Sequence, residues 1–185
     1  MIADKPNVTK AGEAELYALL AEHGIAYAHH THPALFTVAE SRALRGDLPG
    51  GHVKNMFMKD KKGAIWLATC LEDRRIRIRD LEREIGAKGL SFAKEELLWE
   101  TLGVRPGAVT PFGLINDRAA RRVRVALDAQ MLEREPLNFH PLHNEATTAI
   151  SKHGLLKFLT LTGHQPVLVD FDRLEEQERA RQAAR

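Results

Sequence analysis

Three short segments of this sequence place polar or conformationally special residues within apolar surroundings. They are "HVKN" at residues 52–55, "GAVTPFG" at 107–113 and "FHPLHN" at 139–144. An ammonium group such as that of Lys54 holds anionic groups, and a glycine-containing bend exposes backbone N–H and C=O groups. A histidine such as His140 exchanges protons near neutral pH. Together these residue types suit a site that holds an anionic substrate and stabilises developing charge.

Each segment also has a purely structural explanation, and the residues alone leave both open. The stem of Lys54 can pack along a strand while its ammonium group stays in water. Gly107 and Pro111 can simply shape a turn, and His140 can be a buried histidine with satisfied hydrogen bonds. A site is therefore favoured only because the three segments occur together in one chain.

Sequence motifs of several common enzyme classes are absent. The chain has no G-x-x-x-x-G-K-[ST], no G-x-G-x-x-G after a strand, no H-E-x-x-H and no G-x-S-x-G. The stretches "HHTH" (29–32) and "HPLH" (140–143) lack a cysteine or a third ligand at metal-binding spacing. Cys70 lies on an apolar strand, which favours a buried thiol over a nucleophile. We therefore expect any catalysis to proceed without a metal, a cofactor or a covalent protein intermediate.

Composition places the chain among ordinary globular proteins and favours the cytoplasm. It has 185 residues, 44% of them hydrophobic and 28% charged, with one cysteine. It has no apolar run long enough to span a membrane and no secretion signal. The net charge of +2 is too small to indicate nucleic-acid binding by itself. Arginines are concentrated at 72–80 and 117–125, which fits either a nucleic-acid-facing surface or a solvated basic face.

Helices and strands must position these segments, and local signals predict most of them. Residues 51–70 predict a hairpin that turns at "DKKG" and carries Lys54 and Asn55 near its start. Residues 104–117 are apolar despite their prolines and glycines, so we expect an ordered loop. Helices are predicted over 9–23 (capped by Thr9 and ended by Gly24), 38–44 (after a Thr37–Glu40 capping box), 78–85, 94–102 and 152–162. Further strands are predicted at 25–32, 89–93, 121–128, 137–141, 146–151 and 166–171.

The irregular alternation of these elements predicts a single domain of the α/β (α+β) class with a mixed sheet. Residues 1–8 are expected to form an N-terminal extension and 9–172 the domain. Residues 173–185 are expected to be a charged C-terminal tail, either frayed helix or disordered.

The three segments together resemble the prolyl-tRNA editing-domain superfamily, the YbaK-like deacylases. The residues that carry the resemblance are "GHVKNMFMKDKKG", "GVRPGAVTPFGLIND" and "FHPLHNEATTAIS", and it extends from about Thr9 to Asp172. Within the superfamily the chain is most similar to the free-standing ProXp-ala (PrdX) branch, which looks like the editing domain inserted in bacterial prolyl-tRNA synthetase. The resemblance implies a mostly antiparallel, barrel-like mixed sheet flanked by helices.

The resemblance also implies a reaction, which is hydrolysis of the ester between a wrong amino acid and the terminal adenosine of tRNA. For this branch the implied substrate is alanyl-tRNA(Pro). Lys54 matches the family's lysine and Gly107–Pro111 its G-x-x-x-P loop, so Lys54 and Gly107 are the implied catalytic residues. The implied substrate-binding residues are Asn55, Pro111, Phe112, His140 and Asn144. tRNA is the implied partner, prolyl-tRNA synthetase is left open as a second partner, and neither a membrane nor DNA is expected.

In this interpretation Lys54 binds the terminal phosphate or the ester region, and the 107–111 loop polarises the ester carbonyl or orients a water molecule. Lys54 and the Gly107 bend are then expected to face each other across a cavity for a small amino acid. Candidate walls of that cavity are Val53, Met56, Phe112, Leu114 and Ile115. Two alternatives stay open: a substrate such as cysteinyl-tRNA(Pro), and a tRNA- or protein-binding module without hydrolysis.

Overall fold

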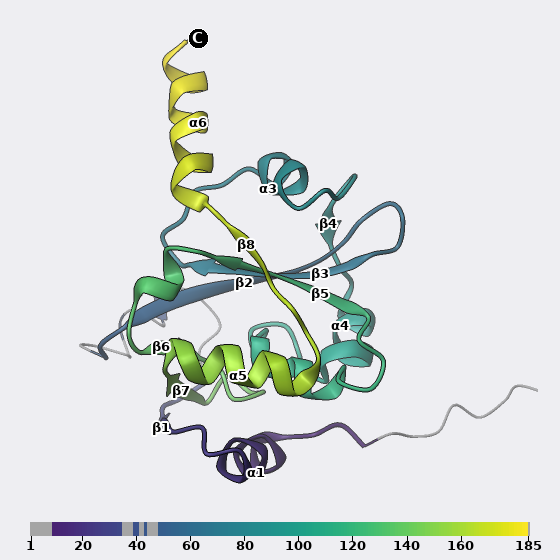
Figure 1. Ribbon diagram of the computed structural model, residues 1–185, viewed down its shortest axis with the longest axis vertical. Coiled ribbons are helices and arrows are strands. Elements are labelled where there is room, and N and C mark those ends of the chain that lie inside the picture. Colours follow the sequence, from purple (N-terminus) through teal and green to yellow (C-terminus); the bar gives the residue numbers. More distant parts are fainter. Residues whose placement is uncertain (1–8, 35–38, 41–42, 44–47, 185) are drawn as a thin grey trace, which may run out of the picture.

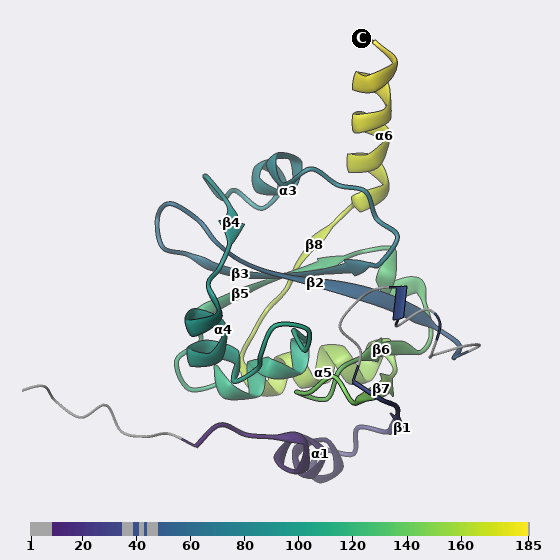
Figure 2. The same cartoon turned by 180° about the vertical axis from the view of Figure 1, so that it is seen from behind.

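A mixed sheet forms the middle layer of the computed structural model, which describes residues 9–34, 39–40, 43 and 48–184 (Figures 1 and 2). Within these residues eight strands pair in the order β1-β7-β6-β2-β3-β5-β8, with β4 joined to β2. Four pairings are antiparallel and three are parallel, which confirms the predicted mixed sheet. The strands are β1 Tyr27–Thr31, β2 Gly51–Lys59, β3 Ile65–Leu71, β4 Ser91–Phe92, β5 Val123–Asp128, β6 Leu137–Phe139, β7 Ala146–Ile150 and β8 Val167–Val169.

Most helices begin and end at the residues that the sequence signals indicate. The helices are α1 Glu13–Glu22, α3 Ile78–Glu84, α4 Glu95–Leu102, α5 Lys152–Thr162 and α6 Phe171–Ala183, with 3-10 helices η1 Pro111–Asn116 and η2 Met131–Glu133. Ser151 caps α5, because its hydroxyl accepts from the backbone N–H of Gly154 at 2.9 Å. Gly103 ends α4 with φ +65°, a left-handed conformation that suits glycine.

Two predicted helix signals have a different outcome. The predicted Thr9 cap of the first helix is wrong, since α1 begins after Gly12, whose backbone N–H donates to the Glu15 carboxylate at 2.8 Å. The Glu15 carboxylate, at the third helical position, thus accepts from the N-cap backbone N–H, and the N-cap glycine has no side chain to cap the first turn as Thr9 was expected to do. The helix predicted over 38–44 falls largely outside the described residues.

Side chains of the central strands alternate between two apolar cores, one on each face of the sheet. Phe57 and Leu67 point into the core that α1, α4, α5 and η1 cover. Met58 and Trp66 point into the other core, which α3 and α6 cover. Figure 1 shows α3 and α6 on one side of β2, β3 and β5, with α4 and α5 on the other. Successive residues of β2 therefore reach different sides of the sheet.

The apolar loop 104–117 is ordered, as predicted, and a buried carboxylate ties its end to β5. Asp117 accepts from the backbone N–H of Val123 at 2.8 Å and lies 3.0 Å from Nε2 of His164. The Asp117 and His164 side chains are each only 2% exposed. Burial favours the neutral acid, but hydrogen bonds from His164 and the backbone outweigh it and lower the pKa of Asp117.

The predicted C-terminal tail is mostly the regular helix α6, which starts within the predicted domain. Phe171 and Leu174 are buried in the core that α6 shares with α3, and Glu178 is also buried. The far half of α6 extends away from the sheet in both views (Figures 1 and 2). Among the described residues, none of these helices combines the length and the apolar character that crossing a membrane requires.

Candidate functional site

The carboxamide of Asn55 links strand β2 to the glycine-containing loop 107–111. Its Nδ2 donates to the backbone carbonyl of Val109 at 2.9 Å, and its Oδ1 accepts from the Thr69 hydroxyl at 2.8 Å. Thr69 lies directly opposite Asn55 in the β2–β3 pairing and is fully buried. These two bonds fix the orientation of the carboxamide and hold the loop against the sheet.

Gly107 occupies a conformation that other residues rarely adopt, with φ +89°. A Cβ atom added there would lie 3.7 Å from Nδ2 of Asn144, which is an ordinary contact. The backbone dihedral, rather than crowding within the protein, therefore calls for glycine. The same distance places Asn144 beside the bend, so the structure brings the second and third sequence segments together.

The residues that follow the bend are packed into the protein. Pro111 begins η1, and the Thr110 hydroxyl caps this turn by accepting from the backbone N–H of Phe112 at 3.3 Å. Phe112 is fully buried, with its ring centroid 5.7 Å from that of Phe139 and 5.4 Å from that of Phe158. Phe112 therefore fixes the loop to the core.

The proposed cavity walls also lie on different sides of the sheet. Leu114 and Ile115 are buried in the same core as Phe112, and Val53 packs at its edge. Met56 instead belongs to the core under α3 and α6, so it does not share a face with the 107–111 loop. Of the five candidates, Val53 is the half-buried one on the face that carries Asn55.

Lys54 leaves β2 on the opposite face from Asn55. It pairs with Cys70, which belongs to the core under α3 and α6. Its ammonium group donates to the backbone carbonyl of Arg74, in the loop after β3. The structure therefore pairs Asn55, rather than Lys54, with the Gly107 bend, because neighbouring residues of a strand point to opposite faces.

His140 lies on the third segment, where its ring is tied to the backbone. The carbonyl of Ala146 can only accept, so Nδ1 of His140 donates to it at 3.1 Å, and Nε2 of the neutral ring is left as an acceptor. The rings of His140 and His32 are 6.4 Å apart. Burial lowers the pKa of His140, although its hydrogen bond to Ala146 opposes the change. His140 is therefore uncharged at neutral pH and able to accept a hydrogen bond or a proton.

The lowered pKa of His140 predicts a loss of stability in acid. The unfolded chain binds a proton at this histidine near its ordinary pKa of 6.5, before the folded protein does, so the free energy of unfolding falls as the pH drops below about 6.5. A His140→Gln protein lacks this titrating group and should lose less stability between pH 7 and pH 5. Urea denaturation of both proteins across this range measures the difference, with pH 8 as the reference. Parallel declines of the two proteins would contradict the prediction.

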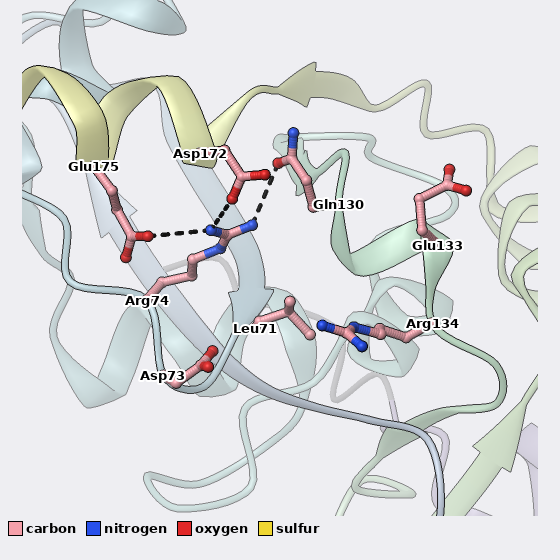
Figure 3. A pocket seen from close by; sticks show the side chains of 8 residues that line it. All are labelled: Leu71, Asp73, Arg74, Gln130, Glu133, Arg134, Asp172 and Glu175. Carbon is pink, nitrogen blue, oxygen red and sulfur yellow. Dashed lines mark hydrogen bonds and ion pairs between the residues drawn. The ribbon is translucent and has the colours of Figure 1, made fainter.

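Two residues that support this region were not singled out from the sequence. Thr69 was identifiable, because counting back from the predicted hairpin turn places it opposite Asn55. Arg74 lies in an arginine cluster that fits a solvated face, yet its side chain is only 8% exposed. It pairs with the fully buried Asp128 at 2.9 Å and borders a hollow of about 370 Å³ (Figure 3). No local pattern distinguishes Arg74 from its exposed neighbours.

Comparison with known proteins identifies the family of this chain. Residues 32–158 match the model of the aminoacyl-tRNA editing domain. The prolyl-tRNA synthetase associated domain-containing protein 1 of Xenopus laevis is 40% identical over 163 residues, which cover 85% of this chain and 96% of that protein. The prolyl-tRNA editing protein ProX of Acetoanaerobium sticklandii is 34% identical over 148 residues, covering 80% and 90% respectively.

Solved structures share the fold at lower sequence identity. The crystal structure of the hypothetical protein APE2540 superposes with a TM-score of 0.66 at 21% identity, over 85% of this chain and 97% of that one. A crystal structure described as a candidate trans-editing enzyme for prolyl tRNA synthetase gives a TM-score of 0.63, also at 21% identity, over 88% and 98%. Both likenesses support the fold.

Proposed function

Because the chain belongs to the aminoacyl-tRNA editing domain family, the YbaK/ProX deacylases, we propose that it hydrolyses mischarged alanyl-tRNA(Pro) in trans, in the cytoplasm. The observation that carries the proposal is the hydrogen bond from Asn55 to the carbonyl of Val109, within the matched residues. This bond joins the β2 segment to the Gly107 loop, and Asn144 of the third segment lies beside the same loop. The three polar segments thus share one locality of the fold.

In this proposal the two faces of β2 contact different parts of the substrate. The ester carbonyl is placed on the Asn55 face, where backbone groups of the 107–111 loop polarise it or orient a water molecule. In this proposal Asn55 contacts the ribose or the aminoacyl group there, and Nε2 of His140, which is free to accept a hydrogen bond, contacts the same part of the substrate. Lys54, on the other face, holds a phosphate of the flexible 3′ end, for which a compact cation on a long stem is suited.

The chemistry needs little more than positioning. An aminoacyl ester is already activated, and the neighbouring ribose hydroxyl can assist its hydrolysis. Holding the ester and a water molecule in reacting geometry supplies a large part of the rate. A protein nucleophile with its own base is therefore not required, and the side chains near the bend act by orienting and by stabilising charge.

Editing also accounts for a preference for small amino acids. A synthetase discriminates weakly against a smaller side chain, because each missing methylene group is worth only about 1–3 kcal/mol. A second site that admits alanine and excludes proline corrects this error. Val53, half-buried on the Asn55 face, is the proposed wall that limits the size of the aminoacyl group.

Deacylation of tRNA(Pro) charged separately with alanine, cysteine, serine or proline tests the proposal. We expect alanyl-tRNA(Pro) to be hydrolysed fastest and prolyl-tRNA(Pro) to be spared, with a ratio of about tenfold or more from size exclusion alone. Release of the radiolabelled amino acid under single-turnover conditions gives the rates.

The other outcomes of this panel are equally informative. Preferential hydrolysis of cysteinyl- or seryl-tRNA(Pro) would keep the reaction and replace the substrate. Binding of all four tRNAs with no hydrolysis above the uncatalysed rate would refute the enzymatic proposal and leave a tRNA-binding module.

A further inference from the structure

One peptide group connects the C-terminal helix to Lys54. The carbonyl of Arg74 accepts from the Lys54 ammonium group. The N–H of the next residue, Arg75, belongs to the same peptide group and donates to Oε1 of Glu175, on α6, at 2.6 Å. A helix residue about a hundred positions away therefore holds one end of the peptide group whose other end holds Lys54.

The Arg74 side chain strengthens this connection. Its guanidinium bonds to Asp172 of α6, lies 3.2 Å from the other carboxylate oxygen of Glu175, and pairs with Asp128 at 2.9 Å. Figure 3 shows Arg74 lying between α6 and Gln130, with Asp172 and Glu175 pointing toward its guanidinium. Burial alone would disfavour the charge, yet hydrogen bonds to Asp128 and Asp172 raise the pKa of Arg74. The guanidinium is thus a charged group whose position is held by both α6 carboxylates, those of Asp172 and Glu175.

Glu175 is suited to this bridging position. Its two oxygens bind different parts of the same loop, one the Arg75 backbone and the other the Arg74 side chain. The side chain is only 21% exposed, so water competes less for these bonds than it would on an open surface. Because Glu175 binds both the Arg74 side chain and the Arg75 backbone N–H, the Arg74 carbonyl between them can take fewer positions.

We propose that Glu175 is a positioning residue for Lys54, acting through the Arg74–Arg75 peptide group. The inference rests on the proposed role of Lys54 in substrate binding. Residues 171–183 lie outside the part of the chain that matches the editing-domain model, so α6 supplements the matched domain. Order in α6 would thereby control the position of a substrate-contacting amine on β2.

A test that does not depend on turnover is the chemical reactivity of the Lys54 amine. Glu175→Ala should increase the rate at which acetic anhydride modifies Lys54 about tenfold, relative to the other lysines, as expected for loss of one charge-assisted hydrogen bond. The exchange rate of the Arg75 amide hydrogen should rise to a similar degree. Mass spectrometry measures both, and kcat/KM for alanyl-tRNA(Pro) should fall about tenfold.

Matched variants separate positioning from charge and from general damage. Glu175→Gln removes the charge but keeps the acceptor oxygen, so it should restore most of the wild-type Lys54 reactivity. Glu176→Ala removes the same charge from the exposed neighbouring position on α6 and should behave like the wild type. If Glu175→Ala does not fold, Glu175→Asp, which is one methylene shorter, should give a smaller increase in reactivity.

Two results would overturn the inference or its premise separately. A folded Glu175→Ala or Glu175→Asp protein with unchanged Lys54 acetylation and unchanged Arg75 exchange would refute the positioning role. If acetylation responds as expected but the wild type hydrolyses none of the aminoacyl-tRNAs, the connection stands and the proposed function fails.

Discussion

Replacing Lys54 with alanine is expected to reduce deacylation of alanyl-tRNA(Pro) by about a hundredfold or more while the protein stays folded. The estimate follows from the roughly hundredfold loss of rate expected when a group that positions the substrate is removed and the ester shifts out of its reacting geometry. Folding should tolerate the change, because Lys54 is only part-buried and its ammonium group has, among the described residues, one hydrogen bond, to the backbone carbonyl of Arg74. Single-turnover rates and thermal denaturation of the two proteins measure activity and folding separately.

Two further variants sharpen this prediction. Lys59→Ala removes a lysine from the exposed far end of the same strand and should keep most of the activity. Lys54→Arg keeps the charge but presents a planar fork in place of a compact ammonium group, so it should recover only part of the rate. Wild-type turnover in the folded Lys54→Ala protein would remove Lys54 from the site.

Replacing Asp117 with alanine should destabilise the protein by about 3–5 kcal/mol, the largest stability effect expected of any single change considered. The substitution leaves Nε2 of the buried His164 and the backbone N–H of Val123 without their partner. Asp117→Asn keeps an acceptor oxygen and should cost less. Because its folded pKa is lowered, the stability contributed by Asp117 is present at neutral pH and is lost as the pH falls through that pKa.

Urea denaturation at pH 7 measures this effect. Glu96→Ala, which removes an exposed carboxylate from α4, should change the free energy of unfolding by less than about 0.5 kcal/mol and serves as the control. Equal and small losses in the Asp117 and Glu96 variants would show that the buried pair contributes little to folding.

Local patterns were enough to predict much of the fold. The β2–β3 hairpin, the Ser151 cap of α5, the stop at Gly103 and the ordered loop 104–117 each depend on residues close in the sequence. The contact between Asn55 and Val109 joins residues 54 positions apart, and no local pattern indicates it. The docking of α6 was missed for a related reason, since Phe171 and Leu174 supply too few apolar residues to form a clear stripe.

The sequence already indicated that Lys54 and Asn55 lie on opposite faces of their strand, but the predicted site did not use this. Lys54 and Asn55 are neighbours on a strand, and the alternation of side chains already assigns them to opposite faces. The expectation that Lys54 faces the Gly107 bend overlooked this period of two. The resemblance to editing domains identifies which residues are involved, but the pleat of the strand decides which of them meets the loop.

Strand β2 is paired with β3 on one edge and with β6 on the other, which limits where residues can be inserted or deleted. Lys54 and Asn55 are consecutive, so a slip of one position against β3 would send the amide toward α6 and the amine toward Val109. β6 opposes such a slip, since it pairs with Gly51 and His52 on the other edge. Insertions and deletions should therefore be tolerated at the Asp60–Gly63 turn and not between Gly51 and Asn55, where one added residue would exchange the chemistry of the two faces.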